Sequence, residues 1–149
     1  MAQFLLITTL LSIAGLIATG VMGFQSTPVH VATHIFFALG TVVIGLFSQS
    51  MTMFFFIGTG KELKEKAEND AEVVRQTKSF KARVFPAATY AMLVLMVTFI
   101  MGGGVSSGKT PRWLHLGLSL ASVLMYGRAY WIQLRAMDEN ARLMEKYLA

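Results

Sequence analysis

Four long apolar stretches follow one another along this chain, separated by short polar breaks or by charged segments. The apolar stretches run over residues 4–24, 29–57, 87–105 and 112–134. Each is long enough to cross the hydrocarbon core of a bilayer, which needs roughly 20 helical residues. None alternates apolar and polar residues as a membrane β-strand does. The pattern therefore predicts a single all-α membrane domain over residues 1–149, built as a four-transmembrane-helix bundle.

Turn signals group the four predicted helices into two hairpins. Thr27-Pro28 and Thr110-Pro111 each place a residue that caps helices before a proline, which suits the first helical position. The glycines at 102–104 and the run 106–108 predict the end of the third helix and a flexible turn. The second and fourth helices are therefore expected to begin at these two Thr-Pro pairs.

A weak internal repeat relates the two hairpins. Met22-Gly23 is followed by Thr-Pro and then by His34, and Met101-Gly102 is followed by Thr-Pro and then by His115. Each half would be one helix out, a short turn and one helix back, as in transporters with parallel repeats. The repeat predicts that His34 and His115 occupy comparable places in the second and fourth helices.

Two charged segments, a connector at residues 60–84 and a tail at residues 135–149, are polar without resembling loops. Both place charged residues at i,i+3 and i,i+4 spacings with apolar residues between them, which favours helix. A turn is expected near Asn69-Asp70. We interpret both segments as solvated helical extensions beyond the membrane, and the alternative is a docking surface for a cytoplasmic protein partner.

The positive charge of the chain is unevenly distributed. The net charge is +5, with 13 Lys and Arg against 8 Asp and Glu, and charged residues make up only 14% of the sequence. Seven basic residues lie in the connector and none between the first two apolar stretches. Excess Lys and Arg marks the cytoplasmic side of a membrane protein, so we interpret the charge as an indication of membrane topology. We therefore do not interpret it as a nucleic-acid-binding surface, and we expect no nucleic-acid partner. Both termini and the connector are then cytoplasmic, in the bacterial inner membrane.

Several classes of function are excluded by what the sequence lacks. There is no cysteine, which excludes disulfides, iron–sulfur clusters and thiol redox chemistry. No Asp or Glu lies within the four apolar stretches, which argues against a proton-coupled small multidrug transporter. No HExxH sequence and no phosphate-binding glycine loop is present. The sequence therefore favours a carrier or sensor over an enzyme.

All three histidines lie at the non-cytoplasmic end of the predicted bundle. His30 and His34 are four residues apart and share one helix face. At about 1.5 Å per residue, they lie roughly 3 Å and 9 Å below Pro28, and His115 lies roughly 6 Å below Pro111. Ionisable groups inside membrane spans are rare and usually functional. The three imidazoles are therefore predicted to contribute to a common site.

Haem b is the cofactor that these residues favour. Imidazole is the usual protein ligand of haem iron, and cofactor sites in bundles use side chains from facing helices. The preferred ligands are His34 and His115, with His30 as a supporting group, an alternative ligand or a propionate contact. One haem per chain is expected. The apolar slot is predicted from aromatic, leucine and small residues near the histidines: Phe36, Phe37, Trp113, Leu116, Leu118, Gly40, Gly45, Gly117 and Ala121.

Arg128 is a basic residue toward the inner half of the fourth apolar stretch. Its side chain can extend to the cytoplasmic lipid headgroups. The alternative is a pairing with an anionic ligand such as a haem propionate or a quinone. Arg128 is therefore included among the candidate cofactor-binding residues.

Two other interpretations of the histidines remain. One is a bare metal ion held by His30, His34 and His115, for which zinc, copper, iron or nickel is suitable. Met22 and Met101 would then add thioether ligands suited to Cu(I) in a metal-handling protein. The haem and metal interpretations do not exclude each other, since His30 could hold a metal ion near a haem. The other is a structural or assembly subunit of a membrane complex, in which the histidines only pack.

At these residues the chain resembles small four-helix membrane b-haem proteins. The resemblance rests on Thr27-Pro28 followed by His30 and His34, and on Thr110-Pro111 followed by His115. The resemblance covers the four spans. Proteins of this kind include electron carriers, quinone-linked anchor subunits and proposed membrane haem sensors. The resemblance implies bis-histidine ligation, with electron transfer or haem and redox sensing as the function, and a quinone or cytoplasmic protein as partner. A homodimer is also expected from the large lipid-facing surface.

Overall fold

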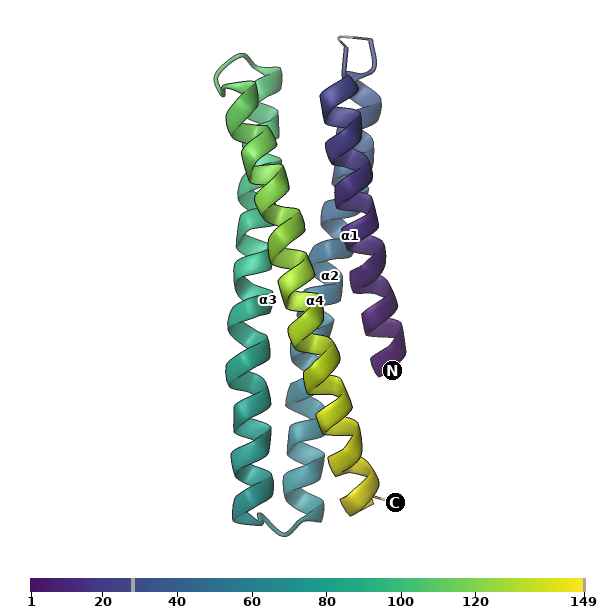
Figure 1. Cartoon of the computed structure of the whole chain (residues 1–149), viewed down its shortest axis with the longest axis vertical. Coiled ribbons are helices and arrows are strands. Elements are labelled where there is room, and N and C mark those ends of the chain that lie inside the picture. Colours follow the sequence, from purple (N-terminus) through teal and green to yellow (C-terminus); the bar gives the residue numbers. More distant parts are fainter. Residues whose placement is uncertain (28, 149) are drawn as a thin grey trace.

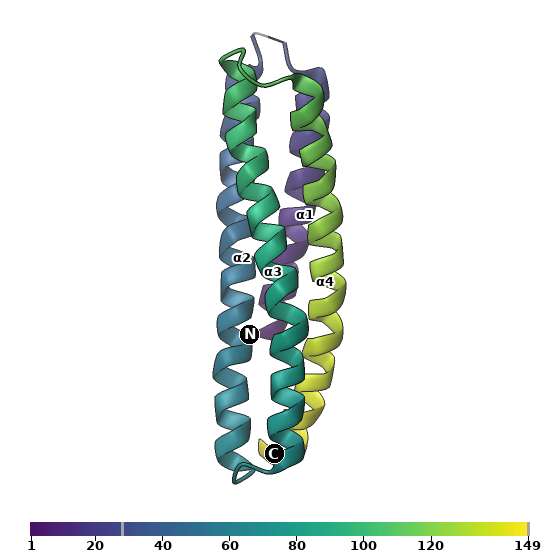
Figure 2. The same ribbon diagram turned by 90° about the vertical axis from the view of Figure 1, so that its left-hand side faces the viewer.

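The computed structural model describes residues 1–27 and 29–148, and these residues form an elongated bundle of four α-helices (Figure 1). The helices are α1 (Ala2–Gln25), α2 (Val31–Lys66), α3 (Ala71–Ser106) and α4 (Arg112–Leu148). The α1–α2 and α3–α4 turns lie at one end, which we call the histidine end. The α2–α3 turn and the C-terminus lie at the other, charged end (Figure 2). The predicted all-α class and the four-helix bundle are confirmed.

Three of the described helices, α1, α2 and α3, are long and apolar enough to cross a membrane. Their outward faces carry large apolar side chains, among them Phe36, Phe54 and Ile100, which are 76%, 63% and 66% exposed. Such a surface is stable only against an apolar medium or a partner. The chain is therefore consistent with a membrane protein. The fourth helix is less apolar because Arg112, His115 and Arg128 interrupt it.

The charged extensions are helical, as predicted. Helix α2 continues to Lys66 and α3 begins at Ala71, so a turn of four residues separates them. Glu68 and Asn69 have positive φ angles of 50° and 59°. The Asp70 carboxylate then caps α3 by accepting from the backbone N–H groups of the residues two and three positions later. The predicted turn near Asn69-Asp70 is confirmed.

At the histidine end, the predicted start of the second helix is wrong, and the three glycines lie in a helix instead of a turn. Helix α2 begins at Val31 with His30 as its N-cap instead of at Thr27, and Pro28 lies outside the described residues. Helix α4 begins at Arg112, where the fourth apolar stretch was predicted to begin. Helix α3 continues through the three glycines to Ser106, and the turn is made by Gly108, whose φ is +72°. Of the three glycines, Gly102 packs against His115 of α4 and Gly104 against Thr110 of the turn.

A buried polar layer separates two apolar core clusters. The cluster at the charged end includes Leu5, Phe56 and Phe80, and the central cluster includes Leu16 and Tyr126. Between them Gln133 Nε2 donates to Gln49 Oε1 at 2.5 Å, and Thr9 Oγ1 lies 3.4 Å from Gln133 Oε1. All three of these polar residues are fully buried. The layer therefore ties α1, α2 and α4 together.

Substitution of one glutamine in this layer is expected to destabilise the protein. In Gln133→Leu the buried Gln49 amide loses its partner, which lowers the free energy of unfolding by about 1–3 kcal/mol. The double variant Gln49→Leu/Gln133→Leu should recover most of this loss because no buried amide is left unsatisfied. Thermal unfolding in detergent, followed by circular dichroism, measures both changes. A double variant no more stable than Gln133→Leu would contradict this role.

Candidate cofactor site between two histidines

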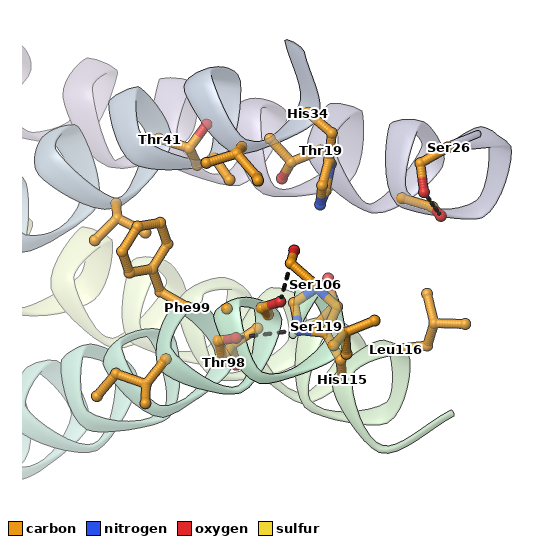
Figure 3. Close-up of a pocket in the computed structure, with 18 of the residues that line it drawn as sticks. Thr19, Ser26, His34, Thr41, Thr98, Phe99, Ser106, His115, Leu116 and Ser119 are labelled. Carbon is orange, nitrogen blue, oxygen red and sulfur yellow. Dashed lines mark hydrogen bonds between the residues drawn. The ribbon is translucent and has the colours of Figure 1, made fainter. Parts of the chain in front are cut away.

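A cavity of about 330 Å³ lies between the two helical hairpins at the histidine end of the bundle (Figure 3). All four helices line it, and the walls are mostly apolar. Its polar groups are two imidazoles, several hydroxyl groups and one guanidinium. Volumes of this order are at the lower end of the range for small-molecule sites, and such sites are typically apolar with a few polar groups.

His34 and His115 face each other across this cavity from opposite hairpins (Figure 3). Their ring centroids are 6.4 Å apart, and the ring planes make an angle of 77°. The structure thus brings together the two residues preferred as ligands.

The two imidazoles differ in their hydrogen bonds. His115 Nδ1 lies 3.1 Å from the Thr98 carbonyl oxygen, which can only accept, so Nδ1 carries the proton. The lone pair of His115 is then on Nε2. Metal-binding histidines typically donate their other N–H to a carbonyl or carboxylate in this way. His34 Nδ1 is buried and has no hydrogen-bond partner among the described residues.

A glycine of the same hairpin packs against each of these histidines. A Cβ atom on Gly23 would lie 3.3 Å from His34 Cε1, and one on Gly102 would lie 2.9 Å from His115 Cε1. Both glycines therefore allow an imidazole to approach the backbone of the preceding helix. The sequence repeat thus corresponds to a repeated contact, with the same pair of residue types in each hairpin.

Arg112 lies at the rim of the cavity and was not identified as a site residue from the sequence. Its Nη2 donates to the carbonyl oxygens of Gly23 at 2.8 Å and Phe24 at 2.9 Å. Carbonyl groups at the end of a helix have no intrahelical partner, so Arg112 caps α1 and joins the two hairpins. Its position three residues before His115, on the same helix face, is the signal that could have found it.

The other predicted site residues lie elsewhere. His30 is exposed at the start of α2, with Nδ1 3.0 Å from Thr27 Oγ1, and it does not line the cavity. Arg128 lines a different cavity, between α3 and α4. Neither Met22 nor Met101 lines the histidine cavity. Within the described residues, no three histidine or acidic side chains are grouped as a metal site would require.

Most of the predicted slot residues are also absent from the cavity. Leu116 lines it, whereas Phe36, Phe37 and Trp113 are 76%, 55% and 73% exposed on the outer surface. Gly45 packs against Tyr126 and Leu95 in the central core. The walls come instead from residues such as Leu16, Ile35, Val42, Leu95 and Phe99. The prediction of these neighbours was wrong because nearness in sequence does not determine which helix face a residue occupies.

The separation of the two ring centroids is the one expected when a metal ion is held between two imidazole nitrogens that face each other. Metal–imidazole bonds of about 2.0–2.1 Å place two opposed nitrogens about 4 Å apart. Adding the distance from each nitrogen to its ring centre gives a centroid separation close to the observed 6.4 Å. Two protein ligands leave the remaining positions of the metal open, and a porphyrin fills these in haem proteins. Two imidazoles in an apolar cavity are thus a donor set that a haem iron or another metal ion could use.

Comparisons with models of known protein families, with curated proteins and with solved structures give no match to this chain. The case for a cofactor therefore depends on the geometry around His34 and His115. That geometry combines two facing imidazoles, a hydrogen bond between His115 and Thr98, and a basic residue at the rim.

Proposed function

We propose that this protein is a four-span integral membrane protein that binds one haem b between His34 and His115 and acts in redox sensing or electron transfer. The observation that carries the proposal is the pair of imidazoles on opposite hairpins, which line one apolar cavity with ring centroids 6.4 Å apart. Cofactor sites in helix bundles are built in this way, from side chains on facing helices.

Each residue at the cavity has a distinct role in this proposal. His34 and His115 would hold the haem iron through a ring nitrogen, and the Thr98 carbonyl orients His115 by accepting its Nδ1–H. The N–H groups of Arg112 that do not contact α1 are available to a propionate at the rim. Gly23 and Gly102 leave space for the rings. When bound, haem supplies reversible one-electron chemistry at its iron.

The fourth span is part of the proposal. Helix α4 packs against both α1 and α3 and lies alongside α3 in both views (Figures 1 and 2). A membrane that is crossed by α3 would therefore enclose α4 as well, over residues 112–134. Two of the polar residues in this stretch have hydrogen-bond partners, since Arg112 caps α1 and His115 is bonded to the Thr98 carbonyl. The positive-inside rule then puts both termini and the charged end in the cytoplasm of a bacterial cell.

The continuity of α2 and α4 favours sensing over simple electron transfer. His34 and His115 lie near the starts of these helices, and both helices continue unbroken to the charged end. A change in the separation of the two hairpins at the cavity is therefore carried by rigid elements to the cytoplasmic extensions. Electron transfer would instead require a redox partner, such as a quinone, near the histidine end.

Absorption spectroscopy of the purified protein tests the proposal. We expect a Soret band, and a b-type α-band in the reduced-minus-oxidised difference spectrum, at one haem per chain. A protein that is colourless as isolated and stays colourless after haem is added would exclude haem binding. That result would favour the alternative of a structural subunit whose histidines only pack. Metal analysis of the colourless protein would then test for a bare ion.

A further inference from the structure

A second cavity lies between α3 and α4, near the point where the apolar part of the bundle meets the charged end. Its volume is about 320 Å³, and its lining includes Arg83, Pro86, Tyr90, Arg128 and Ile132. Arg83 precedes the third apolar stretch, and Arg128 belongs to the inner part of the fourth. The cavity is thus at the level expected for lipid headgroups of the cytoplasmic leaflet in a four-span topology.

This cavity carries one positive charge that no acidic side chain among the described residues offsets. Arg83 Nη1 and Nη2 donate to the two oxygens of Glu139 at 3.0 and 2.5 Å. The hydrogen bond from Arg83 holds the pKa of Glu139 below its ordinary value, so Glu139 is ionised at neutral pH. None of the ion pairs within residues 1–27 and 29–148 includes Arg128. A single anionic group is therefore the electrostatic complement of the cavity.

A proline inside α3 lies among the residues that line the cavity. Pro86 has no N–H, so the carbonyl of Ala82, four residues earlier, cannot receive its usual helical hydrogen bond. Ala82 lines the cavity together with Pro86. A hydroxyl or ammonium group of a ligand can therefore donate to this carbonyl, while Arg128 donates to an anionic oxygen.

Two rows of exposed apolar residues begin at this cavity and run toward the histidine end. On α3 the row is Tyr90, Leu93 and Val97, which are 60%, 50% and 45% exposed. On α4 the row rises from Arg128 through Leu124 and Leu120, which are 65% and 62% exposed. Each row extends over about 10–12 Å of helix. They form an apolar surface on which an acyl chain can lie above a headgroup held at the cavity.

We propose that this cavity binds the phosphodiester headgroup of an anionic glycerophospholipid, with Arg128 donating to the phosphate and the acyl chains lying along α3 and α4. Arginine is suited to this because its planar guanidinium can give two hydrogen bonds to a phosphate. Basic pockets between membrane helices on the cytoplasmic side bind such headgroups in other proteins. The proposal rests on the four-span orientation and does not depend on haem.

The test measures lipid selectivity of the full-length protein in nanodiscs of phosphatidylcholine that contain a minority of spin-labelled phosphatidylglycerol. In Arg128→Gln we expect the preference for phosphatidylglycerol over phosphatidylcholine to fall about fivefold, as for one basic residue close to an anionic membrane surface. Arg135→Gln is the matched control. It removes the same charge seven residues later on α4, where Arg135 stacks on Trp131 at 4.6 Å outside the cavity. Its preference should change less than twofold.

Equal losses in the two variants would indicate a diffuse surface charge and overturn the site. Displacement of the labelled lipid by inorganic phosphate at equal concentration would identify a soluble anion as the ligand and also overturn it. If Arg128→Gln does not fold, the proposal is tested on the wild-type protein by its melting temperature in the two lipids. Its melting temperature should be higher in phosphatidylglycerol than in phosphatidylcholine, and equal values contradict the proposal. The haem spectrum should be the same in Arg128→Gln, so the two proposals fail separately.

Discussion

Replacement of His34 or His115 by alanine is expected to abolish the b-type reduced-minus-oxidised spectrum. Each histidine comes from a different hairpin, and the pair lines the same cavity with ring centroids 6.4 Å apart. No third histidine lines this cavity, so the lost ligand has no replacement within the described residues. The measurement is the difference spectrum and the haem content of each variant, purified in parallel with the wild-type protein.

His30→Ala is the matched control for these two variants. His30 is exposed and bonded to Thr27 outside the cavity, so its loss should leave the spectrum and the haem content unchanged. Free imidazole added to His34→Ala or His115→Ala should restore part of the α-band, because the truncation leaves space for it. An unchanged spectrum in both single variants would refute the assigned ligands. Loss of the spectrum in His30→Ala would show that the site lies closer to the start of α2.

Gly102→Val is expected to have the second largest effect, through the position of His115. A Cβ on Gly102 would lie 2.9 Å from His115 Cε1 and 3.4 Å from both ring nitrogens. Real Cβ atoms do not come this close, so the imidazole must move and its bond to Thr98 must weaken. Overpacking of this kind costs about 1–3 kcal/mol in stability. We expect a lower melting temperature together with a large loss of bound haem.

The controls for Gly102→Val come from other glycines of the chain. Gly117 is exposed on α4, and a Cβ there meets nothing within 4 Å, so Gly117→Val should keep both haem and stability close to wild type. Gly23→Val should give an intermediate effect, because its Cβ would lie 3.3 Å from His34 Cε1. Melting temperature and haem content, measured for all three glycine variants, rank the size of their effects. Equal effects in Gly102→Val and Gly117→Val would show that the contact with His115 is unimportant.

The depth of a residue along the bundle axis was predictable from the sequence, but the helix face on which the residue lies was not. Counting 1.5 Å per residue placed His34 and His115 at similar depths, and the structure brings them together. The same counting could not show that α2 begins only at Val31, so that His30 leaves the shared helix face. Arg128 likewise belongs to the predicted helix, but it faces α3 near Pro86 instead of the histidine cavity.

The sequence alone determined the number of helices, their lengths within a few residues, the helical extensions and the turn near Asn69-Asp70. These features follow from local composition, since apolar length, charge spacing and turn residues act within one segment of chain. Only the tertiary structure decided which groups meet. It placed Gly102 against His115, Arg112 against the end of α1 and Gln133 against Gln49. These contacts depend on how each helix is rotated against its neighbours, and side-chain packing between helices determines that rotation.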